Sequence, residues 1–312
     1  MKSLWFWGKA LIIALAIGWL LRTFVFSAYR IPASSMENTL MEGDYILVGK
    51  YSYGIRLPVT VLGIPFCHDS ILGMKAYSSV LSLPYKRIFK QAVHKDDIIV
   101  FNNPGSDIRI PIDMRKILIG RCLALPGDSL VFKNDLVYVN EKELIQSPNL
   151  LEPYYFHEKD VAWVEKTLSS LVIPEKQTIA VVDSLHVKLF SRQEIYMMKG
   201  LLPDTVALHL LRPAFNLTIP KKGERIAITS DNYFVYLPII TGIEKKDAHY
   251  ENGKLWIDGV EMDAFEFTQD YYWIMPDNRK NFADSSVSSF IPENHLIGKA
   301  LFAWNYGFQK IK

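Results

Sequence analysis

An apolar run near the N-terminus is the strongest feature of the hydropathy pattern. It extends from Trp5 to Ala28, and Lys9 and Arg22 are its only charged residues. A membrane-spanning helix needs about 20 residues, which this run supplies if both basic side chains extend toward the membrane interfaces. The run therefore predicts one transmembrane helix that anchors the chain.

Basic residues around the run predict its orientation. Lys2 and Lys9 favour a cytoplasmic N-terminus with the rest of the chain exported, whereas Arg22 and Arg30 weigh against it. A cleavable signal peptide is the competing interpretation, but the small residues expected before a cleavage site are poorly marked ahead of Tyr29. We expect a single-pass protein whose body lies outside the cytoplasm.

Beyond the anchor, short runs of β-branched and aromatic residues are separated by Gly, Pro and Asp turn signals. The strands that this pattern predicts are 45–48, 97–101, 117–125, 130–139, 271–275 and 297–304. Short strands with frequent turns are typical of β proteins. We therefore expect a mainly β fold with one N-terminal transmembrane helix.

Residues 50–95 interrupt this pattern. They are apolar with scattered prolines, which predicts a long and partly irregular excursion. Two interpretations remain open for their apolar surface, an interfacial platform beside the membrane or ordinary core with loops.

Residues 130–269 predict an inserted β subdomain. Tight-turn hairpins are expected at 136–144 and 255–262, around Asn-Glu and Asp-Gly pairs. The one helix expected here is Arg192 to Lys199, with Ser191 as its N-cap and Gly200 as its stop.

These patterns divide the chain into four predicted parts. They are an anchor (1–28), the first part of a core (29–129), the inserted β subdomain (130–269) and the return of the chain to the core (270–312). A chain of 312 residues has ample material for such a core.

Composition excludes several kinds of partner. The net charge is only +2, so the chain has no basic footprint for nucleic acid. The two cysteines, Cys67 and Cys122, are too few for a disulfide framework, and no Cys/His spacing indicates a metal site. A single disulfide bridge between them is one interpretation, but we expect Cys122 to be a small buried residue in a strand. We expect no metal and no other cofactor.

Five short motifs occur in a fixed order. Ser35-Met36 follows Pro32 closely, and after it come GDYILV (43–48), DIIVFNNP (97–104), ALPGD (124–128) and DNRKNFADS (277–285). This ordered set resembles the bacterial type I signal peptidase family, whose members are serine endopeptidases anchored in the inner membrane. The resemblance implies a fold of antiparallel sheets, with signal peptides of exported preproteins and the lipid bilayer as partners.

The resemblance assigns the nucleophile to Ser35, which precedes the Met of the first motif. Serine attack on an amide requires a base and donors for the oxyanion. A turn serine that bonds the local backbone is the simpler alternative. Ala33 stands where many members have a serine that supports the oxyanion, and other members have glycine there.

The family's general-base lysine lies eight residues before the Asp of LPGD, and this position is Gly120. Arg121 follows, where the family also has arginine. The nearest lysine, Lys116, lies four residues upstream, about 13 Å along a strand, and cannot simply replace the missing amine. Lys280 is another amine in the last motif, but a solvated surface lysine is the simpler reading.

The last motif departs from the family pattern at three positions. Pro276 replaces Gly, Phe282 replaces Ser and Ser286 replaces Arg. The replaced serine is expected to hydrogen-bond the lysine, so the two losses match, and a phenylalanine beside a glycine would fill the space of a lysine stem. The motif's remaining polar residues resemble the family's scaffold, with Asp284 and Arg279 as expected partners; they are Asp277, Asn278, Arg279, Asp284 and Ser285.

Three hypotheses follow. The protein is an active endopeptidase with an unrecognised base, selecting small residues before the cut as its relatives do. Alternatively, it is a silent paralogue that still binds exported segments, because family members hold substrate as an added β-strand and that groove needs no lysine. The third hypothesis is a structural partner of a true peptidase or of the export machinery.

Overall fold

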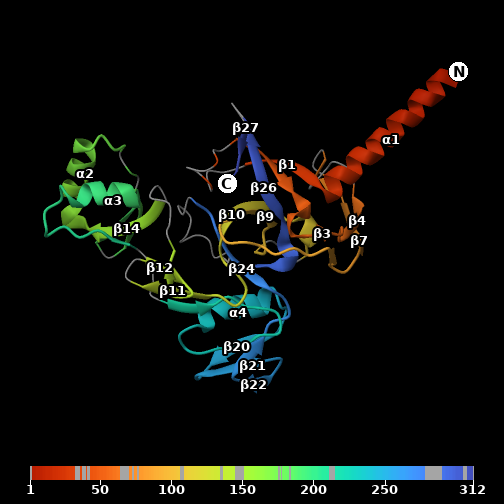
Figure 1. Ribbon diagram of the computed structural model, residues 1–312. Helices are drawn as coiled ribbons and strands as arrows, with labels where there is room; N and C mark the ends of the chain where they lie inside the picture. Colours follow the sequence, from red (N-terminus) through yellow and green to blue (C-terminus); the bar gives the residue numbers. More distant parts are fainter. Residues whose placement is uncertain are drawn as a thin grey trace.

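The computed structural model shows a β body from which one long helix projects (Figure 1). The residues that it describes are 2–31, 36, 40, 43–63, 70–71, 74–75, 77–105, 109–133, 136–144, 151–174, 176, 178–182, 184–210, 215–277, 290–304 and 308–311. Strands predominate, which confirms the mainly β prediction.

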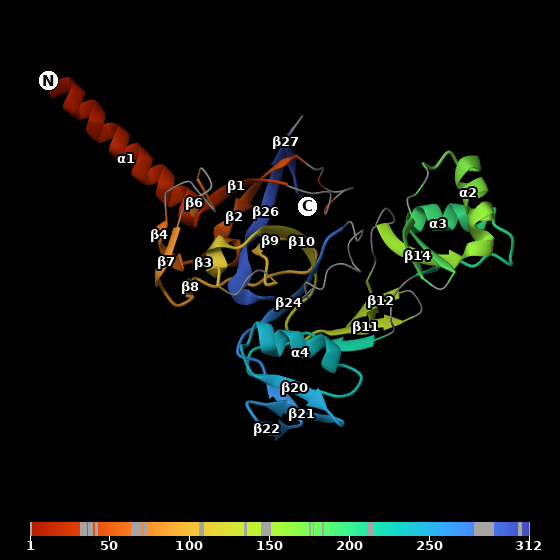
Figure 2. The ribbon, with the colours of Figure 1, turned by 180° about the vertical axis from the view of Figure 1, so that it is seen from behind.

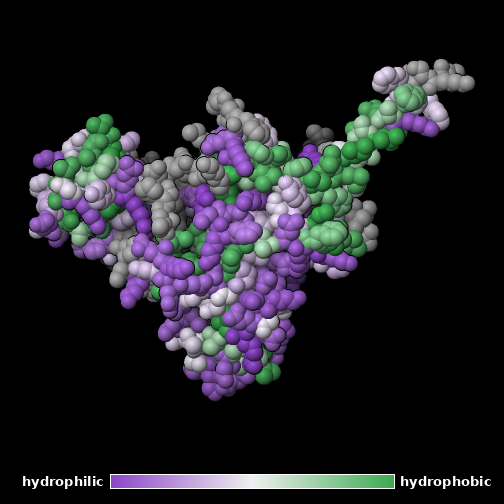
Figure 3. All heavy atoms as spheres, viewed as in Figure 1, coloured by the Kyte–Doolittle hydropathy of each residue, from purple (hydrophilic) through white to green (hydrophobic). Residues whose placement is uncertain are grey.

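Helix α1 (Lys2–Phe24) is the projecting helix. Its segment Trp5–Phe24 is long and apolar enough to cross a membrane and is not buried against the body. Figure 3 shows its hydrophobic surface continuing onto the body at the root of the helix. The predicted N-terminal apolar helix is therefore confirmed.

One antiparallel sheet of eight strands forms the centre of the body. In spatial order its strands are β1 (Phe26–Arg30), β2 (Tyr45–Gly49), β26 (Leu296–Trp304), β9 (Ile98–Asn102), β10 (Ile117–Ala124), β24 (Tyr271–Met275) and β25 (Phe290–Pro292), and β27 (Phe308–Lys310) pairs with β26. Strand β26 from the C-terminal part of the chain lies between β2 and β9, and β24 lies beside β10. Distant motifs are thus brought onto neighbouring strands.

The two faces of the sheet bury different apolar clusters. We call the first the Met36 cluster; it contains Ile31, Met36, Leu40, Ile46, Val48, Ile98, Val100, Ile119, Ile297, Ala300 and Ala303. The second, the Ile274 cluster, contains Tyr53, Val93, Ile99, Phe101, Cys122, Ile274, Ile291 and Leu296. Because successive strand residues point to opposite faces, Ile119 and Gly120 face different clusters.

The stretch between β10 and β24 forms several smaller sheets. Their strands are β11 (Ser129–Lys133), β12 (Leu136–Val139), β13 (Lys142–Glu143), β14 (Leu151–His157), β15 (Thr178–Val182), β16 (Leu185–Ser191), β17 (His209–Leu210), β18 (Phe215–Thr218), β19 (Arg225–Ala227), β20 (Ala248–Glu251), β21 (Lys254–Ile257), β22 (Val260–Met262) and β23 (Ala264–Glu266). Both predicted hairpins are confirmed, as β12–β13 and β21–β22. The predicted division of the chain into four parts stays a prediction.

The expected continuous β run over 130–139 is wrong. Leu130 pairs with Val139, so the chain reverses within the run and makes two antiparallel strands. The sequence has Asn134-Asp135 in the middle of the run, a pair typical of turns.

Helix α3 (Arg192–Lys199) is confirmed together with its cap, since the Ser191 hydroxyl and the Glu194 side chain form a capping box. Two helices were missed, α2 (Val161–Ser170) and α4 (Tyr233–Gly242). Helix α4 is rich in β-branched and aromatic residues and contains Pro238, a composition that favours strands or breaks helices. Its burial of Tyr236, Ile239 and Ile240 in the core overrides that preference.

The excursion after β2 consists of short pieces near the root of α1 (Figure 2). They are η2 (Lys50–Tyr53), β3 (Ile55–Arg56), β4 (Thr60–Gly63), β5 (Ser70–Ile71), β6 (Met74–Lys75), β7 (Tyr77–Ser82) and β8 (Arg87–Ile88), and the strands pair as β3–β8, β4–β7 and β5–β6. The side chains of residues 61–82 lie outside the described part. The proposed interfacial platform therefore stays a prediction.

Candidate functional site

The predicted site residues divide into a described group and a group outside the described residues. Ser35, Asn278, Arg279, Asp284 and Ser285 belong to the second group, together with Ala33, Lys280, Phe282 and Ser286. Met36, Gly120, Arg121 and Asp277 are described. The geometry of the site is therefore built from these four residues and their neighbours.

Met36 follows Ser35 in the chain and is completely buried. It belongs to the apolar cluster that also contains Ile31, Leu40 and Ile119. The first motif is thus joined to β10 by packing. This packing links two segments that lie more than 80 positions apart in the sequence.

Gly120 is enclosed by β24. A Cβ atom at this position would lie 2.7 Å from Cγ2 of Ile274 and 3.0 Å from the carbonyl oxygen of Met275. The first distance is shorter than real Cβ contacts, and the second involves backbone, so a side chain fits only if the strands shift. The predicted filling by Phe282 lies outside the described residues; the described neighbours that close the position are Ile274 and Met275.

Arg121 makes a two-pronged ion pair with Asp277. Its Nε donates to Oδ1 at 3.0 Å and its Nη2 donates to Oδ2 at 2.8 Å, while Nη1 donates to the carbonyl oxygen of Asp96. The hydrogen bonds to Asp277 raise the pKa of Arg121 above its usual value. This pair ties β10 to the residue where the last motif begins. The expected partnership of Asp284 with Arg279 lies outside the described residues.

The first half of β10 has an open side. β24 pairs only with Arg121, Cys122 and Ala124, whereas β9 pairs with residues 117–121. The N–H of Cys122 donates to the carbonyl oxygen of Asp97, and the N–H of Asn103 donates to that of Lys116. Along β10, residues that bond β9 alternate with residues whose backbone groups point to the other side. By this alternation the N–H and C=O groups of Ile117 and Ile119 point away from β9. No strand among the described residues pairs with them on that side.

Two described lysines, Lys116 and Lys299, lie on or near the central sheet and bear on the prediction that the base is absent. Lys116 is exposed and precedes the strand. Lys299 lies opposite Ile99, on the face of Gly120, but forms an ion pair with the buried carboxylate of Asp97. Tyr53 also donates to Asp97, at 3.0 Å. Lys299 therefore belongs to a structural polar cluster, which the sequence motifs did not reveal.

The remaining chemical groups do not form a second centre within the described residues. Cys122 is a free thiol, completely buried as predicted, and burial raises its pKa. Cys67 lies outside the described part. Among the described residues, no group of three His, Cys, Asp or Glu side chains is arranged to hold a metal ion.

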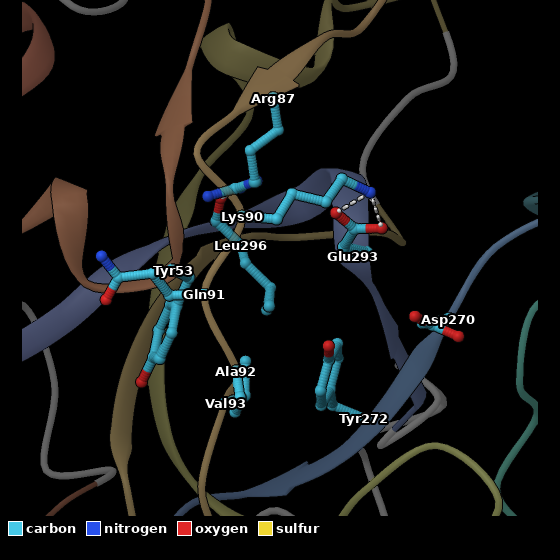
Figure 4. Close-up of a pocket in the computed structure, with 10 residues that line it drawn as sticks. All are labelled: Tyr53, Arg87, Lys90, Gln91, Ala92, Val93, Asp270, Tyr272, Glu293 and Leu296. Carbon is cyan, nitrogen blue, oxygen red and sulfur yellow. Dashed lines mark hydrogen bonds and ion pairs between the residues drawn. The ribbon is translucent and has the colours of Figure 1, made fainter.

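A pocket of about 290 Å³ lies beside the Ile274 cluster (Figure 4). Lys90 and Glu293 form an ion pair at its rim, and Tyr272 and Leu296 contribute to its wall. Arg87 donates to the carbonyl oxygens of Gly54 and Leu296. None of the four described site residues lines this pocket, and its charged groups Arg87, Lys90 and Glu293 are already paired.

Comparison with known proteins identifies the family. The sequence matches the family described as "Signal peptidase, peptidase S26" over residues 4–305. It is 24% identical to signal peptidase I of Buchnera aphidicola subsp. Baizongia pistaciae over 298 residues, covering 95% of this chain and 75% of that protein. It is 26% identical to signal peptidase I of Rickettsia conorii over 301 residues, covering 96% and 78%. The chain therefore belongs to the signal peptidase I family.

Proposed function

We propose that this protein binds the signal peptides of exported preproteins at the bacterial cytoplasmic membrane and does not cleave them by a lysine-assisted mechanism. It would act in signal peptide processing as a receptor for the segment that its relatives, named signal peptidase I, act on. The closed position of Gly120 carries the proposal, because a general base needs space for its side chain.

The open side of β10 supports the binding part of the proposal. An extended peptide can add to the unpaired N–H and C=O groups of Ile117 and Ile119 as a further strand. The apolar cluster of Ile31, Met36, Leu40 and Ile119 lies beside this edge. We expect small apolar residues in the bound peptide to be preferred over large ones, as the family resemblance implies.

The contacts of Gly120 support the proposal that lysine-assisted cleavage is absent. A lysine at this position would collide with Ile274 through its first side-chain carbon. Removing one member of a catalytic unit can cost up to about 10⁶ in kcat. Ser35 without a base is therefore expected to be a very poor nucleophile.

An active endopeptidase is the alternative function. The observation that favours it is the retained first motif, since Met36 keeps a fully buried position against β10. In this case Ser35 would attack with a base from outside the described residues.

Cleavage of a preprotein by the purified full-length protein in detergent separates the two functions. The arms are the native protein, Ser35→Ala, and a repaired variant that combines Gly120→Lys, Phe282→Ser and Ile274→Leu. Ile274→Leu is included because it removes the Cγ2 atom that blocks position 120. We expect no difference between the native protein and Ser35→Ala. Cleavage by the native protein that Ser35→Ala abolishes would refute the proposal.

Peptide binding tests strand addition directly. A fluorescent signal peptide is compared with peptides N-methylated at successive positions, which cannot donate a backbone hydrogen bond there. We expect binding to be lost with methylation at alternate positions, because a β-strand presents its N–H groups alternately to each side. Equal binding of all methylated peptides contradicts strand addition. If the native protein binds no signal peptide, a structural role beside a true peptidase is favoured.

A further inference from the structure

The joint between the membrane helix and the body is unusually short. Helix α1 ends at Phe24 and β1 begins at Phe26, so only Val25 separates them. The N–H of Val25 still bonds the carbonyl oxygen of Leu21 in the helical pattern. The chain therefore passes from helix to strand without a flexible linker.

Lys50, the first residue of η2 directly after β2, hydrogen-bonds this joint. Its Nζ donates to the carbonyl oxygens of Arg22 at 2.9 Å and Thr23 at 3.2 Å. Its own N–H donates to the carbonyl oxygen of Val25, and the hydroxyl of Ser27 donates to that of Arg22. The last carbonyls of a helix lack partners within the helix and carry partial negative charge. An ammonium group is the matching cap.

The surroundings of Lys50 show that the cap is built into the fold. Burial, beside Arg56 and Arg22, lowers the pKa of Lys50 to about 8. The ring of Tyr51 packs edge-to-face on Phe26, with 5.5 Å between the ring centres. No acidic side chain pairs with Lys50 among the described ion pairs. The amine therefore serves the helix end rather than a salt bridge.

The side chains of α1 from Trp5 to Arg22 are exposed, so the described contacts of the helix with the body lie at its C-terminal end. A helix of 23 residues is roughly 34 Å long and acts as a lever on this one joint. From the joint, β1 runs five residues, roughly 17 Å, toward the first motif, and β2 returns from it.

We propose that Lys50 is a positioning residue that locks the membrane helix to the β1–β2 hairpin. It thereby holds the peptide-binding edge at one angle and height above the bilayer. A signal peptide embedded in the same membrane then meets β10 in a single register. The effect on the register of a bound signal peptide rests on the proposed function. The lock between α1 and the β1–β2 hairpin does not depend on it.

Distance measurements between spin labels test the lock without any substrate. Labels are placed at Ala14→Cys in α1 and Gln309→Cys in β27, in full-length protein carrying Cys67→Ser, in nanodiscs of phosphatidylethanolamine and phosphatidylglycerol. Cys122 is fully buried and needs no replacement. We expect one narrow distribution for the native joint.

Lys50→Met keeps the length of the side chain and removes its donors. The distribution should broaden about twofold because the helix end loses its cap. Lys50→Arg should restore the narrow distribution, and Lys246→Met, which breaks only an exposed pair with Asp258, should leave it unchanged. An unchanged distribution in Lys50→Met, or a broadened one in Lys50→Arg, overturns the proposal.

Photo-crosslinking then tests the register. A signal peptide with a crosslinker at successive positions should react with the native protein mainly from one position and with Lys50→Met from several. Broadened distances with an unchanged crosslinking pattern would retain the lock but reject its role in register. Absence of crosslinks in the native protein would instead count against the proposed function.

Discussion

The two faces of β10 differ in how tightly residues of other segments pack against them. On one face, Ile119 packs with Met36 of the first motif in a closed apolar cluster. On the other, Gly120 lies against Ile274 and Met275 with no space for a side chain. One face therefore buries the residue that follows Ser35, while the other leaves no space for a side chain at position 120.

This difference separates recognition from hydrolysis. Strand addition needs an open backbone edge and apolar neighbours, which the first half of β10 supplies. Under the proposed function, general-base catalysis by a lysine would need space for its side chain, which the packing around Gly120 does not leave. Each of the following predictions tests one part of this contrast.

The largest effect is expected on the Met36 face. Met36→Ala removes a completely buried side chain and should lower the free energy of unfolding by about 2–5 kcal/mol. Urea unfolding of the full-length protein in detergent, followed by tryptophan fluorescence, measures the change. The control is Met262→Ala on β22, where the side chain is partly exposed. Equal costs for both variants would mean that the first motif is not anchored in the core.

A smaller effect is expected at Gly120. Gly120→Ala should cost about 1–3 kcal/mol of unfolding free energy because the new methyl group overlaps Ile274. Ile274→Leu in the same chain should recover part of the loss. Gly242→Ala serves as the control, since nothing lies within 4 Å of a Cβ there. If Gly120→Ala is as harmless as this control, position 120 has space for a side chain and its packing does not exclude a lysine.

Polar groups are buried where η5 (Glu293–His295) meets the residues before β10, and their effect on stability depends on pH. His295 is buried next to Arg115 and Asn294, and burial lowers its pKa to about 3. Because the folded pKa lies below the unfolded value, its stabilising contribution is complete above about pH 6.5 and is lost toward pH 3. The slope should reach at most about 1.4 kcal/mol per pH unit.

Unfolding of the native protein and His295→Gln across this pH range measures the effect. The variant should show a shallower loss of stability in acid, since its amide cannot take up a proton. Identical slopes would show that other groups control the acid response.

The smallest effect is expected for the ion pair that joins β10 to the last motif. Arg121 and Asp277 are partly exposed, so solvent weakens their attraction. A double-mutant cycle with Arg121→Met and Asp277→Asn should give a coupling of about 1 kcal/mol. The more exposed pair of Lys254 and Glu261 should couple less. A coupling no larger than in that pair would remove Arg121 from the structural scaffold.

Much of the fold could be predicted from local patterns. The apolar run of α1, the strands β2, β9, β10, β24 and β26, and the Ser191 N-cap of α3 each depend on residues within one short window. Periodicity and capping act over such distances, so the sequence alone determined these elements. Helix α4 was missed because its strand-favouring residues become helical only when Tyr236, Ile239 and Ile240 pack into the core.

The description of the candidate site depended on both the sequence motifs and the tertiary contacts. The sequence motifs predicted that Gly120 occupies the position of the family's lysine and that Arg121 follows it, and both assignments stay predictions. Only the tertiary structure decided that Ile274 closes this position, that Asp277 pairs with Arg121, and that Lys50 caps α1. These contacts join residues 28 to 156 positions apart. They depend on which distant segments lie side by side, and a pattern within one short window does not specify that pairing.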